Sequence, residues 1–309
     1  MTICNPHHLR HAIRLALLLV FPFTAASLDA AEQADSAVAK PNAASSKPYF
    51  NPWTRKTALV MLGTKDSWHM RLEQVNAFAG LLTGFCKLSP HFSSVPEDFT
   101  FDNIRKYDVV VLYTALADYS RKKDENVTKT ALENIFQAVQ AGTPLLSFHG
   151  GIYNTSIDGR PKEIPAGPEV HEIERQVGAK YFFDLHYPFQ EFKINISKEH
   201  PITKGVTDFM VADEIYMLDI LDPAAEILAT YDARSVKKSD PEKPSPKKQM
   251  IIDSIALGNA RPQAPALYAR TYCKGKIVVN ILGHNEQSMC NPSVIKLYQQ
   301  SFDWLFSGK

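Results

Sequence analysis

The sequence predicts an α/β fold with a doubly wound, mostly parallel sheet in a single domain. Two observations predict this class: short, continuous apolar runs that suit buried parallel strands, and amphipathic segments of helical period between them. Along the first half of the chain they alternate as strand, helix, strand, helix, strand. The 309 residues are 45% hydrophobic and 22% charged, so a single large core can be buried.

The first half of this domain supplies the clearest elements. Three apolar runs are predicted strands: Lys56–Gly63, Lys106–Thr114 and "TPLLSFHGG", Thr143–Gly151. The segments between them, Ser67–Phe85 and Glu125–Gly142, carry apolar residues at helical spacing. We therefore expect the three strands to lie parallel, with helices as the crossovers.

The second half is less regular. Strands are predicted at Phe189–Ser197, Ala225–Tyr231, Pro265–Tyr272 and Lys276–His284, with helices at Pro168–Gly178 and Asn291–Phe306. The charged, proline-rich segment Arg234–Gln249 is predicted to be a solvated loop.

The N-terminus has the order of a secretory signal peptide. Arg10 and Arg14 precede an apolar run that ends in small residues. The sequence therefore predicts a signal peptide over 1–27, a disordered linker over 28–54, and a domain over 55–309, exported to the periplasm or the cell exterior. An uncleaved membrane anchor is the alternative, and the mature form has no apolar run long enough to span a bilayer.

Charge and cysteine content exclude several classes. A net charge of +1 argues against nucleic acid as the partner, because phosphate binding needs a basic surface. Cys86, Cys273 and Cys290 are an odd number without CxxC spacing, so neither a disulfide scaffold nor a zinc ribbon is expected.

Two predicted strands end in histidine and glycine. The third strand runs into His149-Gly150-Gly151, and the late strand Lys276–His284 closes on Gly283-His284. Ligands of open α/β sheets bind at the carboxyl ends of strands, and glycine allows the backbone to approach them closely. Histidine suits proton transfer near neutral pH or metal ligation. His149 and His284 are therefore the leading site candidates.

Other polar and aromatic residues are candidates for the same site. Asp213-Glu214 precedes Tyr216 in a segment expected to be a loop, and His186 lies in an acidic and aromatic segment. Candidates for binding a substrate at this site are His186, Tyr113, Tyr153, Asp213, Tyr216, Gly150 and Gly151. No cofactor is required by this interpretation. A divalent metal is the alternative, and its ligands would be His149, His186, His284 and Glu214.

Two segments resemble a known family. "HPITKGVTDFMVADEIYML" (His200–Leu218) and "PALYARTYCKGKIVVNILGH" (Pro265–His284) are similar to hallmark segments of the ThuA-like (trehalose utilization) family. This family belongs to the class I glutamine amidotransferase-like superfamily, so the resemblance, which covers Lys56 to Phe306, implies a flavodoxin-like sheet.

The chain departs from the family pattern at three positions. Cys273 replaces a common glycine, Tyr268 replaces a tryptophan, and Phe189 stands where the pattern His-x-Pro-His has its second histidine. If that histidine binds metal in relatives, this chain has lost one ligand.

The resemblance also interprets the end of the third strand. In glutamine amidotransferases this strand ends in an elbow, G-x-C-x-G, that exposes a nucleophilic cysteine. Here His149 takes the place of the cysteine and Gly151 keeps the second glycine. Imidazole suits proton transfer or ligation rather than attack on a carboxamide, which argues against glutaminase activity.

The function that the resemblance implies is disaccharide utilization through 3-keto sugars. We expect acid–base chemistry on an oxidised sugar, with His149, His284 and Glu214 as catalytic residues. The expected partners are a small carbohydrate substrate and a sugar oxidoreductase, and a homo-oligomer is left open. The alternatives are a non-catalytic carbohydrate-binding module and a metal-dependent hydrolase.

Overall fold

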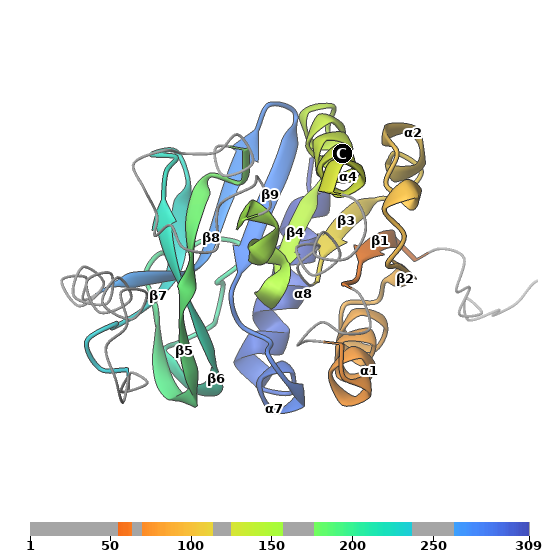
Figure 1. Cartoon of the computed structure of the whole chain (residues 1–309). Coiled ribbons are helices and arrows are strands. Elements are labelled where there is room, and N and C mark those ends of the chain that lie inside the picture. The colour runs from red at the N-terminus through yellow and green to blue at the C-terminus, as the bar shows by residue number, and fades with distance from the viewer. Residues whose placement is uncertain (1–54, 64–69, 114–124, 157–175, 237–262, 309) are drawn as a thin grey trace, which may run out of the picture. The chain divides into compact units, whose positions relative to one another are not determined.

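The computed structural model describes residues 55–63, 70–113, 125–156, 176–236 and 263–308 (Figure 1). These residues lie in one unit of the chain, Phe50–Lys309. The predicted signal peptide, the linker, most of the predicted helix Pro168–Gly178 and most of the charged segment lie outside them. In the ranges described, no helix combines the length and hydropathy needed to cross a bilayer.

Five strands form the parallel half of the sheet. They follow the order β2 (Ser89–Ser93), β1 (Thr57–Met61), β3 (Val109–Leu112), β4 (Leu145–Phe148) and β9 (Gly275–Asn280). Every residue of β3 and β4 is buried, which explains why their sequences are apolar apart from Ser147. The three strands predicted in the first half and the late strand are confirmed, with shorter bounds.

The other half of the sheet is antiparallel. It continues from β9 through β8 (Ala264–Tyr272), β7 (Glu226–Tyr231), β5 (Ala179–Ile196) and β6 (Phe209–Ile220). The sheet is therefore mixed, and the expectation of a mostly parallel sheet holds only for the half from β2 to β9.

Strand β6 corrects a second expectation. Asp213-Glu214 was predicted to lie in a loop, but both residues lie inside this strand. From Phe209 to Ile215 the strand alternates between more and less buried residues, the period-2 pattern of a strand with one covered face. The pattern was not recognised in the sequence because adjacent carboxylates, Asp213 and Glu214, are more typical of a loop.

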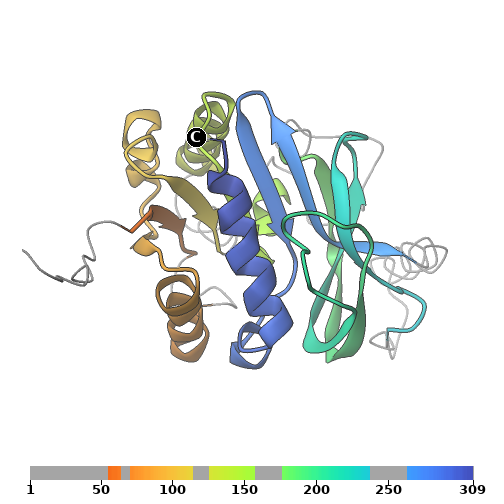
Figure 2. The same ribbon diagram turned by 180° about the vertical axis from the view of Figure 1, so that it is seen from behind.

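Helices cover both faces of the parallel half. At the start of β9, Gly275 packs against the backbone of α4 (Glu125–Gln140), whereas the next residue, Lys276, donates hydrogen bonds to the end of α8 (Pro292–Phe306). Successive strand residues point to opposite faces, so α4 and α8 lie on opposite sides. Figure 2 presents the face crossed by α8. The remaining helical segments are α1 (Leu72–Gly80), its π-helical continuation Leu81–Phe85, Pro96–Asp98, α2 (Phe101–Ile104), His149–Ser156 and α7 (Glu286–Met289).

An aromatic stack fills the core below the carboxyl end of β4. Phe78 of α1 stacks on Tyr113 with ring centroids 4.2 Å apart, and its ring lies 4.4 Å from that of Phe148. Phe148 in turn stacks on Tyr298 of α8 at 4.6 Å. The stack joins α1, β4 and α8, and it fixes the point from which the chain turns into His149.

The cysteines described here are free thiols. Cys86 is partly buried, and Cys273 and Cys290 are exposed. This agrees with the expectation that the domain is not a disulfide scaffold.

Asp108 stabilises the start of the parallel half, and its loss is expected to show as a pH-dependent defect. Its carboxylate accepts hydrogen bonds from Thr57 N (2.8 Å), Thr57 Oγ1 (3.1 Å) and Lys56 Nζ (2.8 Å). Burial acts to raise the pKa of Asp108, but these hydrogen bonds and the Lys56 charge lower it below its usual value. The stabilisation is therefore complete above about pH 4, the pKa in the unfolded chain, and is lost as pH falls through the lower folded pKa.

We expect Asp108→Asn to lower the free energy of unfolding at pH 7 by about 1–3 kcal/mol. The difference from wild type should be smaller at about pH 3, because the unfolded chain already binds the proton there and part of the stabilisation is lost. Urea unfolding at the two pH values measures this, with the exposed carboxylate change Glu97→Gln as the control. A difference that is the same at both pH values would contradict the assignment.

Candidate functional site

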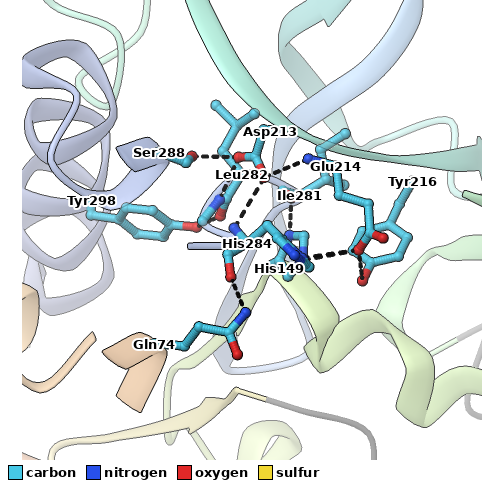
Figure 3. A network of polar contacts seen from close by, with 11 residues as sticks. Gln74, His149, Asp213, Glu214, Tyr216, Ile281, Leu282, His284, Ser288 and Tyr298 are labelled. Atoms are coloured by element: carbon cyan, nitrogen blue, oxygen red, sulfur yellow. Dashed lines mark hydrogen bonds and ion pairs between the residues drawn. The ribbon is translucent and has the colours of Figure 1, made fainter. Parts of the chain in front are cut away.

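The two histidines predicted at strand ends lie side by side. His149 follows β4 and His284 follows β9, and these strands are parallel neighbours. His149 Nε2 lies 3.2 Å from His284 Nδ1 (Figure 3). His149 is 2% exposed, whereas 24% of the His284 side chain is accessible. The pair therefore has one buried member and one that solvent or a ligand can reach.

Glu214 completes the cluster from a distant strand. Its Oε2 lies 3.0 Å from His284 Nδ1 and 3.7 Å from His149 Nε2, and it accepts a hydrogen bond from Tyr216 OH at 3.1 Å. Strands β9, β8, β7 and β5 stand between β4 and β6 in the strand order. The β5–β6 hairpin must therefore fold back toward the carboxyl edge of β4 and β9 to deliver this carboxylate.

A β-bulge lies directly opposite Glu214. Tyr187 pairs with Ile215 and Gln190 pairs with Asp213, so Pro188 and Phe189 on β5 face a single residue on β6. A proline fits a strand at a bulge because it has no N–H to donate, and bulges are frequent beside active sites. The bulge places Phe189 at the rim, where it is 43% exposed with its ring centroid 6.0 Å from that of His284.

His149 has an unusual backbone conformation. Its φ is +38°, in the left-handed region that few residues other than glycine adopt. The imidazole is held by a 2.6 Å hydrogen bond between Nδ1 and the carbonyl oxygen of Ile281. Because a carbonyl can only accept, Nδ1 carries a proton. In the neutral ring, the Nε2 lone pair therefore faces Glu214 and His284.

The turn after His149 has no space for a side chain at Gly151. A Cβ at this position would lie 2.1 Å from the carbonyl oxygen of Leu112 in β3. We expect Gly151→Ala to lower the free energy of unfolding by at least about 1–3 kcal/mol, because backbone atoms cannot move aside as a flexible side chain would. Gly80→Ala is the control, since a Cβ there meets nothing within 4 Å and alanine favours the helix. Thermal unfolding of both variants checks this, and equal melting temperatures would contradict it.

Asp213 is a buried support for the cluster. It is fully buried, and its carboxylate accepts hydrogen bonds from Gly283 N (2.7 Å), His284 N (3.0 Å), Glu214 N (2.8 Å) and Ser288 Oγ. Burial raises the pKa of Asp213, although the four hydrogen bonds act against that shift. Its role in this structure is to fix the backbone of both Glu214 and His284. The expectation that Asp213 contacts substrate is corrected accordingly.

Electrostatics favour a proton on His284. Burial acts to lower the pKa of His284, but the hydrogen bond and charge of Glu214, with the charge of Asp213, raise it above the usual value. The side chain of His284 therefore stays protonated to higher pH than a free histidine. The cluster therefore pairs one imidazole whose Nε2 lies within hydrogen-bond distance of His284 Nδ1 with a second imidazole, His284, whose pKa is raised.

Comparison with known proteins places the chain in a family. The family model for ThuA, described as trehalose utilisation, matches residues 57–305. The chain belongs to the ThuA family. No curated protein matches it.

Solved structures of ThuA-like proteins have the same fold. A ThuA-like protein from Bacteroides uniformis is 16% identical, with a TM-score of 0.56 over 82% of this chain and 93% of that one. Another, from Parabacteroides merdae, is 18% identical, with a TM-score of 0.52 over 82% and 91%. A protein described as cytoplasmic, from Salmonella typhimurium LT2, is 14% identical, with a TM-score of 0.50 over 81% and 99%. At these identities the likeness concerns the fold alone.

In this member of the ThuA family, the other residues predicted to bind substrate are either buried or have side chains that the structure does not describe. Tyr113 and Tyr216 are buried beneath the cluster, so their rings support the site and are not available for stacking on a sugar. Gly150 and Gly151 are buried in the turn after β4. Tyr153 lies in the helical segment His149–Ser156 and His186 pairs with Tyr216 across β5 and β6; the described structure does not extend to their side chains.

Three residues of the candidate site were not predicted from the sequence. Gln74 of α1 donates a 2.7 Å hydrogen bond to the carbonyl oxygen of His284, and Ser288 of α7 donates to Asp213. Phe189 was noted only as a departure from the family pattern. The signal for Phe189 was Pro188, because a proline inside a strand indicates a bulge.

Proposed function

We propose that this ThuA-family protein catalyses acid–base chemistry on an oxidised carbohydrate, such as a 3-keto disaccharide. The observation that carries the proposal is the convergence of His149 Nε2, His284 Nδ1 and Glu214 Oε2 within 3.7 Å of one another at the carboxyl edge of the sheet. Ionisable groups with different environments are what general acid–base catalysis requires. The family, described as trehalose utilisation, supports a disaccharide as the substrate class.

The three side chains can divide the reaction between them. In a 3-keto sugar the hydrogen on C2 is acidic because it lies beside the carbonyl. His149 Nε2 accepts this proton, and the C–H electron pair forms the enolate of the ketone. When the enolate collapses, the C1–C2 double bond forms, the bond from C1 to the glycosidic oxygen breaks, and His284 gives its proton to the departing oxygen. Glu214 stabilises the protonated form of His284.

Turnover of a keto sugar by the purified protein tests the proposal. Trehalose, sucrose and their 3-keto forms would be incubated with the protein, and products followed by chromatography. We expect consumption of the keto forms only. Consumption of none of them, or binding of a sugar without turnover, would overturn the proposal and favour a non-catalytic carbohydrate-binding module.

Phe189 is expected to contribute to substrate binding. An exposed aromatic ring next to His284 can stack on the apolar face of a sugar ring. We expect Phe189→Ala to raise KM about 10-fold with little change in kcat, and Phe189→Tyr to remain near wild type. Met210→Ala is the control, because Met210 is also exposed on the β5–β6 hairpin but lies at its far end. A KM equal to that of the control would contradict this role.

Three further features belong to the proposal. The strand order β2-β1-β3-β4-β9 supports a flavodoxin-like arrangement of the parallel half. The basic, apolar and small-residue order of residues 1–27 supports export. A sugar oxidoreductase that supplies the ketone is the partner that the reaction requires.

A further inference from the structure

We propose that His149, Glu214 and His284 together bind one divalent transition-metal ion of the zinc class. The three side chains provide two imidazole nitrogens and one carboxylate oxygen, all within 4.8 Å of one another. The proposal concerns the same side chains as the proposed function but a different property, the occupancy of the site by a cation.

The distances between the three atoms fit one coordination shell. They are 3.0 Å for Glu214 Oε2 to His284 Nδ1, 3.2 Å for His149 Nε2 to His284 Nδ1, and 3.7 Å for His149 Nε2 to Glu214 Oε2. Zinc holds nitrogen and oxygen ligands at about 2.0–2.2 Å, which separates neighbouring ligands of a tetrahedron by about 3.3–3.6 Å. The three atoms therefore form a triangle of the size that such an ion requires.

The surrounding hydrogen bonds orient these atoms as metal ligands are usually oriented. His149 donates its Nδ1–H to the carbonyl oxygen of Ile281, which leaves the Nε2 lone pair facing the cluster. Tyr216 donates to the Glu214 oxygen that faces both histidines. A metal-binding histidine typically gives its other ring N–H to a carbonyl, and ligating carboxylates are themselves hydrogen-bonded. Backbone strain at His149 is consistent with a position that is fixed for function.

The donor set selects the class of ion. Imidazole with carboxylate suits zinc and its transition-metal neighbours, whereas magnesium and calcium prefer oxygen ligands alone. Phe189 at the rim supplies no ligand atom, so the set described here has three protein ligands. Three ligands with an open position are typical of catalytic zinc sites, and structural sites are closed by a fourth. The open position would accept water or a sugar oxygen.

The cation would change how the site works without changing where it is. At its open position the cation would polarise the ketone, or it would bind water and ionise it to the hydroxide that accepts the proton assigned above to His149. With the cation bound, the same site would also be able to catalyse hydrolysis of a carbohydrate derivative.

A zinc titration of the full-length protein tests the proposal without any sugar. After treatment with a chelator and its removal, ZnCl₂ would be added in a calorimeter, and CoCl₂ in a spectrophotometer. We expect one saturable Zn²⁺ site. Bound Co²⁺ should show the visible absorption bands of an ion with a low coordination number, and excess Mg²⁺ should not abolish the binding of either ion. Glu214→Gln and His284→Gln should each weaken Zn²⁺ binding at least about 100-fold, more than the loss of an outer hydrogen bond does.

The control variant is His200→Ala. His200 lies elsewhere, with its Nδ1 accepting from Ile202 N, and the variant should bind Zn²⁺ as wild type does. The N-terminal histidines His7, His8 and His11 are present in every variant, so they cannot produce a difference between them. Absence of saturable binding, or equal binding in Glu214→Gln and wild type, would overturn the proposal. Either result would leave the keto-sugar reaction to be judged by turnover alone.

Discussion

Replacement of His149 is expected to lower kcat for a 3-keto disaccharide by about 10²–10⁴-fold, the usual contribution of a positioned general base. His149 is the buried member of the cluster, and its Nε2 faces both Glu214 and His284. No other described side chain of the cluster combines a ring nitrogen that faces both partners with a buried position. Initial rates at saturating substrate measure the loss.

The choice of substitution separates chemistry from folding. Asparagine tolerates a positive φ better than most residues, so His149→Asn removes the imidazole at a position where φ is +38°. We expect its melting temperature to stay close to that of wild type. His200→Ala, which removes a histidine outside the cluster, should keep full turnover. Turnover of His149→Asn within a few-fold of wild type would exclude His149 as the base.

Replacement of Asp213 by alanine is expected to have the largest effect on stability. Four donors would lose their acceptor at once, two of them from buried hydrogen bonds and two from partly buried ones, and each unsatisfied buried group costs about 1–3 kcal/mol. We expect a loss of at least about 3 kcal/mol in the free energy of unfolding, together with a loss of turnover because His284 and Glu214 are no longer held. Urea unfolding and initial rates measure the two effects.

Asp213→Asn and Asp208→Asn complete this test. The asparagine at 213 keeps one acceptor oxygen and should recover part of the stability. Asp208 forms a surface ion pair with Lys193, so its replacement should cost less than about 1 kcal/mol. If Asp213→Ala cost no more than Asp208→Asn, the supporting role of Asp213 would be wrong.

The strands that could be predicted most clearly from the sequence are those with mostly or wholly buried residues. Strands β3 and β4 are buried along their whole length, so their sequences are short runs that are apolar apart from Ser147, and such runs are typical of buried strands. Strand β2 was missed because it lies at the edge of the sheet. Its sequence, Ser89–Ser93, contains a proline and alternates between exposed and partly buried residues.

The two histidines of the site could also be predicted from a local pattern in the sequence. His149 and His284 follow parallel strands, and the carboxyl edge of such strands is a local feature of the sequence. The position of Glu214 depends on how the β5–β6 hairpin folds back, and no local pattern encodes that. The burial of Asp213 was missed because its four donors come from residues as far away as Ser288.

Proton NMR of 3-keto-trehalose in D₂O, with and without the protein, tests the central claim most directly. If the cluster of His149, Glu214 and His284 moves a proton beside the ketone, the signal of the hydrogen on C2 will disappear faster than in buffer, by exchange or by elimination. The effect will be lost in His149→Asn, reduced in Glu214→Gln, where proton transfer to the departing oxygen is impaired, and retained in His200→Ala. Loss of the signal at the buffer rate, or at equal rates in wild type and both cluster variants, would contradict the claim.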